Sequence, residues 1–290
     1  MASYFPFDPN PRKPSVRLPA GSCDSQFHVL GPRDTYPVRD GAAYEMPTAT
    51  VETALKLHRT LGIERGIIVQ PTTYGADHSV TIDGLAMAGP NYRGCANAAV
   101  FSDADDASLE RLHKAGIRGA RFSRAALGIQ LSDQEFARAV ARAQELGWYV
   151  KVQPEPDGIT NNIGPFEKLT CPVLLDHMGR PDPRRGKDDP SLRKVIELLK
   201  RGNFWVMLSL SEKVSKSGPP WTDVIPIMRA LIEAAPHRVV WASDWPHPVS
   251  ATQPPNEADL VELLFRATHD DAERQRILVD NPTHLFGFNT

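Results

Sequence analysis

The sequence predicts a single (β/α)8 barrel of the TIM type, and three observations support this prediction. Eight short apolar runs with strand-like composition recur along the 290 residues, separated by amphipathic segments or loops. About eight such units in roughly 250 residues is the spacing expected of a closed parallel barrel. No Gly-x-Gly-x-x-Gly follows the first run, which argues against a doubly wound dinucleotide-binding sheet.

The expected strands and helices follow one another at regular intervals. The strands are 23–29, 65–70, 94–100, 117–123, 148–153, 171–177, 204–210 and 238–244. Two helices carry clear boundary signals: 50–62 ends on Gly62, and 132–147 opens with the capping-box pair Ser132 and Glu135. The other expected helices are 191–202, 223–236 with Pro226 near its start, 257–269 and 271–282.

The first twenty residues differ in character from the rest. Residues 1–20 are proline-rich and lack the apolar region of a secretory signal. We expect them to form an extended arm that wraps the surface or a neighbouring subunit, followed by one barrel domain over 21–290. Three widely spaced cysteines, without Cys-x-x-Cys spacing, indicate free thiols in a cytoplasmic protein. The sequence leaves open whether the protein is a homo-oligomer.

Composition narrows the classes of partner. The net charge is −2 and no basic block is present, so nothing indicates a nucleic-acid partner. No apolar run is long enough to span a bilayer, so we expect no membrane association. A small molecule is the partner that remains.

Polar side chains stand at nearly every expected strand end. Because barrel enzymes build their active sites from the carboxyl ends of the strands, these residues are candidates for the site. They are Gln26, His28, Gln70, Thr72, Thr73, Arg121, Arg124, Gln153, Glu155, Asp176, His177 and Asp244.

Each candidate also has a structural interpretation. His28 could be a core histidine, Asp244 a turn residue, and His247 a turn residue packed beside Trp245. For Asp176 we favour a supporting role, orienting His177 or capping the following loop, over direct chemistry. The other histidines fall in helices or loops and are interpreted as surface or packing residues. Only their joint occurrence makes His28, His177 and Asp244 a candidate catalytic set.

Three segments carry a family resemblance. They are Asp24-x-Gln26-x-His28 on the first strand, "LLDHMGRPD" at the sixth and "WASDWPHP" at the eighth. Together they resemble the amidohydrolase superfamily, in particular the branch containing 2-pyrone-4,6-dicarboxylate lactonase and galactarolactone isomerase. The likeness runs from about Gly21 to Phe286, and it implies a barrel hydrolase that opens a small carboxylated lactone.

The first strand departs from the usual pattern of this superfamily. Members usually carry His-x-His there, whereas this chain has Gln26-x-His28, and glutamine is a poor ligand for zinc-like ions. No bridging lysine is obvious, since the fourth strand offers Arg121 instead. The resembled branch includes enzymes that work without a divalent metal. We therefore expect no metal and no other cofactor, although two imidazoles and one carboxylate leave weak zinc binding open.

The resemblance implies a role for each site residue. Asp244 would be the general base that activates water, while His28, His177 and Gln26 would polarise the lactone carbonyl. Arg121 suits one substrate carboxylate, and Arg124 or Lys213 a second. Tyr44 and Thr72 match substrate-contacting positions of the pyrone lactonase. The residues implied to bind substrate are thus Arg121, Arg124, Tyr44, Thr72, Gln153 and Lys213.

Two departures indicate a substrate other than the pyrone dicarboxylate. Gln153 stands where the pyrone lactonase has a tyrosine, and Leu127 where it has a second arginine. The segment "EKVSKSGPPW" is expected to form a mobile loop over the mouth, in which Lys213 and Lys216 are candidates for anion contact or simply solvated lysines.

Three alternative functions remain open from the sequence. A lactone isomerase of sugar-acid catabolism would share nearly all of these residues. A metal-dependent amidohydrolase or decarboxylase is disfavoured by Gln26. A barrel without activity, binding a carboxylated molecule as a sensor, would show ligand stabilisation without turnover.

Overall fold

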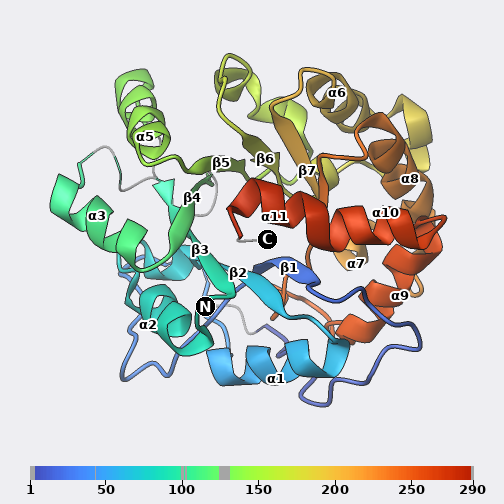
Figure 1. Ribbon diagram of the computed structural model, residues 1–290, viewed down its shortest axis with the longest axis horizontal. Coiled ribbons are helices and arrows are strands. Elements are labelled where there is room, and N and C mark those ends of the chain that lie inside the picture. Colours follow the sequence, from blue (N-terminus) through green and yellow to red (C-terminus); the bar gives the residue numbers. More distant parts are fainter. Residues whose placement is uncertain (1–3, 43, 99–100, 102, 124–130, 289–290) are drawn as a thin grey trace.

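The structure, a computed structural model, describes residues 4–42, 44–98, 101, 103–123 and 131–288. Eight parallel strands form one sheet in sequence order, and helices surround it as a single domain (Figure 1). The strands are β1 Cys23–Phe27, β2 Arg65–Val69, β3 Tyr92–Asn97, β4 Ile117–Phe122, β5 Tyr149–Val152, β6 Val173–Leu175, β7 Phe204–Leu208 and β8 Val239–Trp241. The predicted (β/α)8 architecture is confirmed.

Backbone hydrogen bonds join the last strand to the first and close the ring. Just beyond β8, the Asp244 amide donates to the Gln26 carbonyl at 3.1 Å. In return, the His28 amide donates to the Trp245 carbonyl at 2.7 Å. This seam brings Gln26 and His28, at the end of β1, next to Asp244, just after β8.

The helices begin and end where local signals place them. They are α1 Val51–Leu61, α2 Ser79–Ala88, α3 Asp106–Lys114, α5 Asp133–Glu145, α6 Pro190–Leu199, α7 Ser211–Val214, α8 Ile225–Ala234, α9 Glu257–Ala267, α10 Asp271–Gln275 and α11 Asn281–Phe286. The capping box of Ser132 and Glu135 is formed, and Gly62 ends α1 at a φ of 85°. A π-helical stretch, Arg276–Asp280, links α10 to α11.

Three helices are absent from the sequence-based expectation: α2, α3 and the four-residue α7, which lies at the start of the segment that was expected to be a loop. The ten residues of α2 include β-branched Val80, Thr81 and Ile82 as well as Gly84, all weak helix formers. Tertiary packing stabilises this helix, because a Cβ at Gly84 would lie 3.2 Å from the Ile68 side chain of β2. For α3 a usable signal existed, since Asp105 caps the helix by accepting from the Ser108 amide.

The interior of the barrel is packed with side chains. Inward-facing residues of the strands form one cluster, namely Cys23, Ile67, Val69, Cys95, Tyr149, Leu174, Trp205, Met207, Val240 and Ala242. At one end the C-terminal segment adds Phe286 and Phe288, and α11 crosses the middle of the ring in Figure 1. The rings of Tyr149 and Phe286 lie 5.2 Å apart, so this end is closed by aromatic packing. The active site is therefore expected at the opposite end, where the carboxyl ends of the strands lie.

The N-terminal segment lies along the barrel of its own chain. The Phe5 amide donates to the Ser250 carbonyl, and the Phe7 ring packs 4.7 Å from Trp245. Further along, Arg12 forms an ion pair with Glu262 of α9 at 2.7 Å. The segment therefore follows the loop after β8 toward the mouth of the barrel.

None of the helices in the described part of the chain has the length and apolar character that a membrane crossing requires.

Candidate active site

A pocket of about 360 Å³ opens at the carboxyl ends of the strands. Its walls come from the loops after most strands and from the N-terminal segment. The lining residues include Tyr4, His28, Tyr44, Thr72, Arg121, Ser123, Gln153, Glu155, His177, Arg180, Lys213 and Asp244. The structure thus brings together in one cavity of ligand size eight of the ten residues that were expected to act on the substrate or bind it.

His28 and Asp244 form the centre of the pocket. His28 Nε2 lies 3.5 Å from Asp244 Oδ1, and both side chains are almost fully buried. The Nδ1 atom of His28 is 2.8 Å from the Val69 carbonyl, which can only accept, so Nδ1 carries a proton. Nε2 therefore carries a proton only when both ring nitrogens are protonated. Burial raises the pKa of Asp244, but His177, His28 and Lys213 outweigh this effect and hold the pKa well below its usual range.

Gln26 lies behind this pair rather than in the wall of the pocket. Its Nε2 donates to Asp244 Oδ1 at 2.5 Å, and the side chain has no exposed surface. We expected the amide to contact the substrate carbonyl; in the structure its donor is directed to the carboxylate. Gln26 therefore fixes the orientation of Asp244, and its own Oε1 is buried without a hydrogen-bond partner in the described residues.

His177 enters the pocket from a strained turn after β6. Both His177 and Met178 have positive φ values, 54° and 57°, and so does Asp244 at 61°. Such conformations cost about 1–3 kcal/mol each and cluster at functional sites. Gly179 lets the turn sit against α6, because a Cβ there would lie 2.5 Å from the Val195 side chain.

The protonation state of His177 follows from its surroundings. Burial lowers the pKa of His177 to about 3, so the ring is neutral at physiological pH. Its Nδ1 lies 2.9 Å from the hydroxyl of Ser209, at the end of β7. When Ser209 donates to Nδ1, the single ring proton resides on Nε2.

Arg121 belongs to a buried cluster of charged side chains. Its Nε donates to Asp176 Oδ2 at 3.2 Å, and Lys151 of β5 forms an ion pair with the other oxygen of Asp176. Burial raises the pKa of Asp176, but Lys151 and then Arg121 outweigh it, so the pKa is lowered and the carboxylate stays ionised. We expected Asp176 to orient His177 or to cap the following loop. Instead, its carboxylate pairs with Arg121 and Lys151, and no contact with the His177 ring is seen among the described side chains.

Tyr44, Thr72, Gln153 and Lys213 lie on the walls of the pocket, whereas Gln70 and Thr73 do not line it. Thr72 Oγ1 is 3.4 Å from the Tyr44 hydroxyl, and the Gln153 amide oxygen accepts from Ser123 at 2.5 Å. Lys213, at the rim, donates from Nζ to the Pro248 carbonyl at 2.7 Å. Arg124 and Leu127 lie outside the described residues.

Five polar residues in or beside the site were missed from the sequence: Tyr4, Ser123, Lys151, Arg180 and Ser209. Ser123 and Ser209 stand at strand ends, where the same rule that found Gln153 could have found them. Lys151 alternates with Tyr149 on β5, and this period places both inside the barrel. Arg180 follows His177 by three residues in the same turn.

His247 is more than a turn residue beside Trp245. It is fully buried, with Nδ1 at 3.1 Å from Glu212 and Nε2 at 3.3 Å from Glu257. Burial lowers the pKa of His247, but the two carboxylates outweigh it and raise the pKa to about 10. The imidazolium therefore ties the loop after β8 to α7 and α9.

The donor set of the pocket does not fit a divalent metal. Within the described ranges, no three His, Cys, Asp or Glu side chains are grouped so as to hold a metal ion. Where a second histidine would coordinate, Gln26 directs its amide nitrogen at the carboxylate. That amide hydrogen would point at any metal bound to the same oxygen of Asp244.

Comparison with known proteins identifies the family. A model of the amidohydrolase family matches residues 23–288. The chain belongs to the amidohydrolase family.

Three relatives align along nearly their whole length. The chain is 36% identical to a 4-sulfomuconolactone hydrolase of Hydrogenophaga intermedia, covering 93% of this chain and 90% of the relative. It is 32% identical to a 2-pyrone-4,6-dicarboxylate hydrolase of Comamonas testosteroni, covering 96% and 93%. Identity to a D-galactarolactone isomerase of Agrobacterium fabrum is also 32%, covering 94% and 93%. A solved apo structure from Agrobacterium tumefaciens, 29% identical, superimposes with a TM-score of 0.80 over 95% of this chain and 99% of that chain.

Proposed function

We propose that this amidohydrolase opens a small lactone bearing acidic groups, using water activated by Asp244 and no metal. The observation that carries the proposal is the Gln26–Asp244–His28 arrangement beside a pocket that also presents Arg121 and Lys213. Two of the relatives named above are hydrolases of acidic lactones, which supports this substrate class.

The reaction begins with a water molecule held by Asp244. The ionised carboxylate takes one proton as the water oxygen bonds to the lactone carbonyl carbon. The tetrahedral intermediate then collapses, and the bond between the acyl carbon and the ring oxygen breaks. Asp244 returns its proton to the ring oxygen, so one water is consumed and a hydroxy acid, or its keto tautomer, is released.

Two histidines stabilise the oxyanion in this proposal. Neutral His177 donates from Nε2 because Ser209 occupies its Nδ1, and His28 donates from Nε2 as an imidazolium. One such donor contributes about 10²–10³ in rate. The two therefore supply the polarisation that a metal would provide in other members of the family.

Arg121 orients the substrate through one of its acidic groups. Its Nε is held by Asp176, so the two Nη groups are presented in a fixed plane that suits a carboxylate or sulfonate. Lys213 suits a second acidic group at the rim, and Tyr44 and Thr72 supply hydroxyls to the same pocket. Buried Cys23 and Cys95 are free thiols, which fits the reducing cytoplasm that we propose as its location.

Turnover of a panel of carboxylated and sulfonated lactones, with elemental analysis of the purified protein, tests this proposal. We expect hydrolysis that survives chelator treatment, with metal well below one per chain. One tightly bound metal per chain, with activity lost on its removal, would overturn the metal-free mechanism. Ligand-induced stabilisation without turnover of any lactone would favour the sensor instead.

An isomerase is the second candidate, because one relative of equal identity carries that name. In that reaction a hydroxyl of the substrate replaces water as the nucleophile, with the same base and donors. Reaction in H₂¹⁸O separates the two outcomes. Hydrolysis places one ¹⁸O in the product carboxylate, whereas acyl transfer between hydroxyls places none.

A further inference from the structure

Lys151 is a buried cation next to the active-site pocket, and the proposed mechanism does not use it. It belongs to β5, has no exposed surface and does not line the pocket. Its register partner on β4 is Arg121, and neighbouring strands lie about 4.8 Å apart. Two positive side chains therefore project from adjacent strands into the interior of the barrel.

A single carboxylate, that of Asp176, serves both cations. The Asp176 amide donates to the Val152 carbonyl at 3.0 Å, which places the residue against the end of β5. One carboxylate oxygen pairs with Lys151, and the other accepts from Arg121 Nε at 3.2 Å. Among the described residues, no other Asp or Glu lies within ion-pairing distance of either cation. The cluster thus carries one more positive charge than negative charge.

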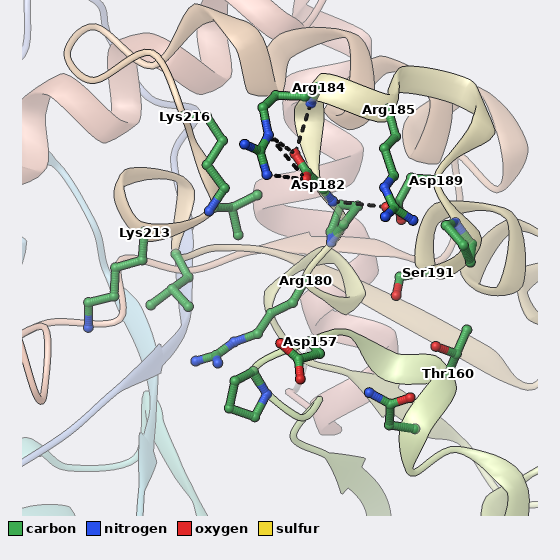
Figure 2. A pocket seen from close by; sticks show the side chains of 16 residues that line it. Asp157, Thr160, Arg180, Asp182, Arg184, Arg185, Asp189, Ser191, Lys213 and Lys216 are labelled. Carbon is green, nitrogen blue, oxygen red and sulfur yellow. Dashed lines mark hydrogen bonds and ion pairs between the residues drawn. The ribbon is translucent and has the colours of Figure 1, made fainter.

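An exposed ion pair on the loop after β6 is balanced in a way that the buried cluster is not. Arg184 donates to Asp182 from Nε at 3.0 Å and from Nη2 at 2.7 Å, so one guanidinium faces one carboxylate (Figure 2). Water also screens this pair, and such surface pairs contribute little to stability. No solvent reaches Lys151 or Asp176, so the surplus charge of their cluster is not screened and acts on the adjacent pocket.

Packing does not require a lysine at position 151. Its Nζ lies 3.8 Å from Met207 Sδ, and an unbranched apolar side chain of the same length would fill this space without desolvating a charge. Burial lowers the pKa of Lys151, which reflects the same cost, and the Asp176 carboxylate opposes this effect. Through Asp176, the charge of Lys151 is connected to Arg121, which does line the pocket.

Resting on the lactone chemistry proposed above, we propose that Lys151 is a positioning residue that keeps the charge of Arg121 available to the substrate. Asp176 fixes the Arg121 guanidinium through Nε, but a carboxylate shared with no other cation would also neutralise that guanidinium. Lys151 occupies the second carboxylate oxygen and compensates its charge. The acidic group of the substrate then supplies the negative charge that the cluster lacks.

The kinetic test compares a carboxylated lactone with its uncharged carboxamide. Lys151→Met leaves Asp176 and Arg121 as a balanced pair, so KM for the carboxylated lactone should rise about tenfold, the value of one charge-assisted hydrogen bond. The rise for the carboxamide should be several-fold smaller, because that substrate brings no charge to Arg121. Lys56→Met, at an exposed position of α1, is the matched control and should alter neither KM. Equal rises for the two substrates, or no rise, would overturn the proposal.

A second substitution distinguishes charge from packing. When Lys151→Met is combined with Asp176→Asn, the asparagine keeps an oxygen that accepts from Arg121 Nε, but the competing negative charge is gone. We expect KM for the carboxylated lactone to return to within about threefold of wild type. A double variant that binds as weakly as the single one, or more weakly, would mean that lost packing causes the defect, and would overturn the proposal.

Calorimetry with glutarate separates this inference from the proposed function, because it requires no turnover. Affinity for glutarate should fall about tenfold in Lys151→Met and recover in the double variant. This pattern in a protein that hydrolyses no lactone would leave the role of Lys151 standing and remove the lactonase. Equal affinities of wild type and Lys151→Met for glutarate would overturn that role, whatever the turnover.

Discussion

Two histidine–aspartate pairs lie at the seam between β1 and β8, and they differ in what surrounds them. His28 Nε2 is 3.5 Å from Asp244 in the wall of the pocket. His58 Nε2 is 3.3 Å from Asp24, in a region without solvent access. Asp24 also accepts from the Ser243 amide and hydroxyl, and the other nitrogen of His58 contacts the Tyr92 hydroxyl. The second pair is saturated by protein partners.

The contrast shows that residue type alone does not mark a catalytic pair. Each side-chain oxygen of Asp24 and each ring nitrogen of His58 has a partner within the fold, so this pair contributes rigidity. Around Asp244, the pocket leaves room for a water and a substrate to complete the hydrogen bonds. Unused hydrogen-bonding capacity facing a cavity therefore separates the reactive pair from the structural one.

The largest effect should come from Asp244→Asn. Removing the base lowers kcat about 10³-fold, within the range typical of general-base catalysis, while the barrel stays folded. Steady-state kinetics with a circular-dichroism spectrum measures both quantities. Activity within tenfold of wild type would show that Asp244 is not the base. The His28–Asp244 pair would then not be the catalytic pair.

Asp24→Ala should act on stability instead. It leaves buried donors of Ser243, Gln26 and His58 without their acceptor, and the free energy of unfolding should fall by about 3 kcal/mol or more. Urea denaturation measures this change. The same substitution at exposed Asp188 is the control and should cost about 0.5 kcal/mol or less. Equal losses at the two positions would contradict the structural role of Asp24.

The His247 cluster is a third arrangement, in which two carboxylates hold one imidazolium. The pKa of His247 is about 10 in the folded protein against 6.5 when unperturbed, so the folded state binds the proton more tightly. Its contribution to stability is complete below pH 6.5, declines between pH 6.5 and 10, and is absent above that.

Melting temperatures of wild type and His247→Gln, compared from pH 6 to 10.5, test this prediction. Wild type should be the more stable at pH 6, and its advantage should shrink as the pH rises through 10. Parallel curves across the whole range would mean that the imidazolium is not held by Glu212 and Glu257.

The smallest effect is expected from Ser209→Ala. Without the hydroxyl on Nδ1, the His177 ring is free to place its proton on either nitrogen, and kcat should fall about tenfold with little change in KM. Ser25→Ala removes another buried strand hydroxyl, one without a partner among the described residues, and should leave kcat within about twofold. If both variants lose activity equally, Ser209 has no specific role.

The sequence predicted the barrel because hydrophobic periodicity and cap residues are local signals. The helix α2 was missed since its residues are weak helix formers, and packing against β2 decides its conformation. In the site, the strand-end rule located His28, His177 and Asp244 in one pocket. It could not show that Gln26 turns toward Asp244, or that Lys151 lies under Arg121, because these contacts depend on side-chain directions across the barrel.

The N-terminal segment has a practical consequence for enzyme preparations. Tyr4 forms part of the rim of the pocket, and the segment behind it is fastened by a few exposed contacts such as Arg12 with Glu262. Limited proteolysis near residues 8–12 would remove the rim without touching a strand of the barrel. A clipped sample would keep every strand of the barrel and most of its mass, yet active-site titration would count fewer competent molecules than the protein concentration implies.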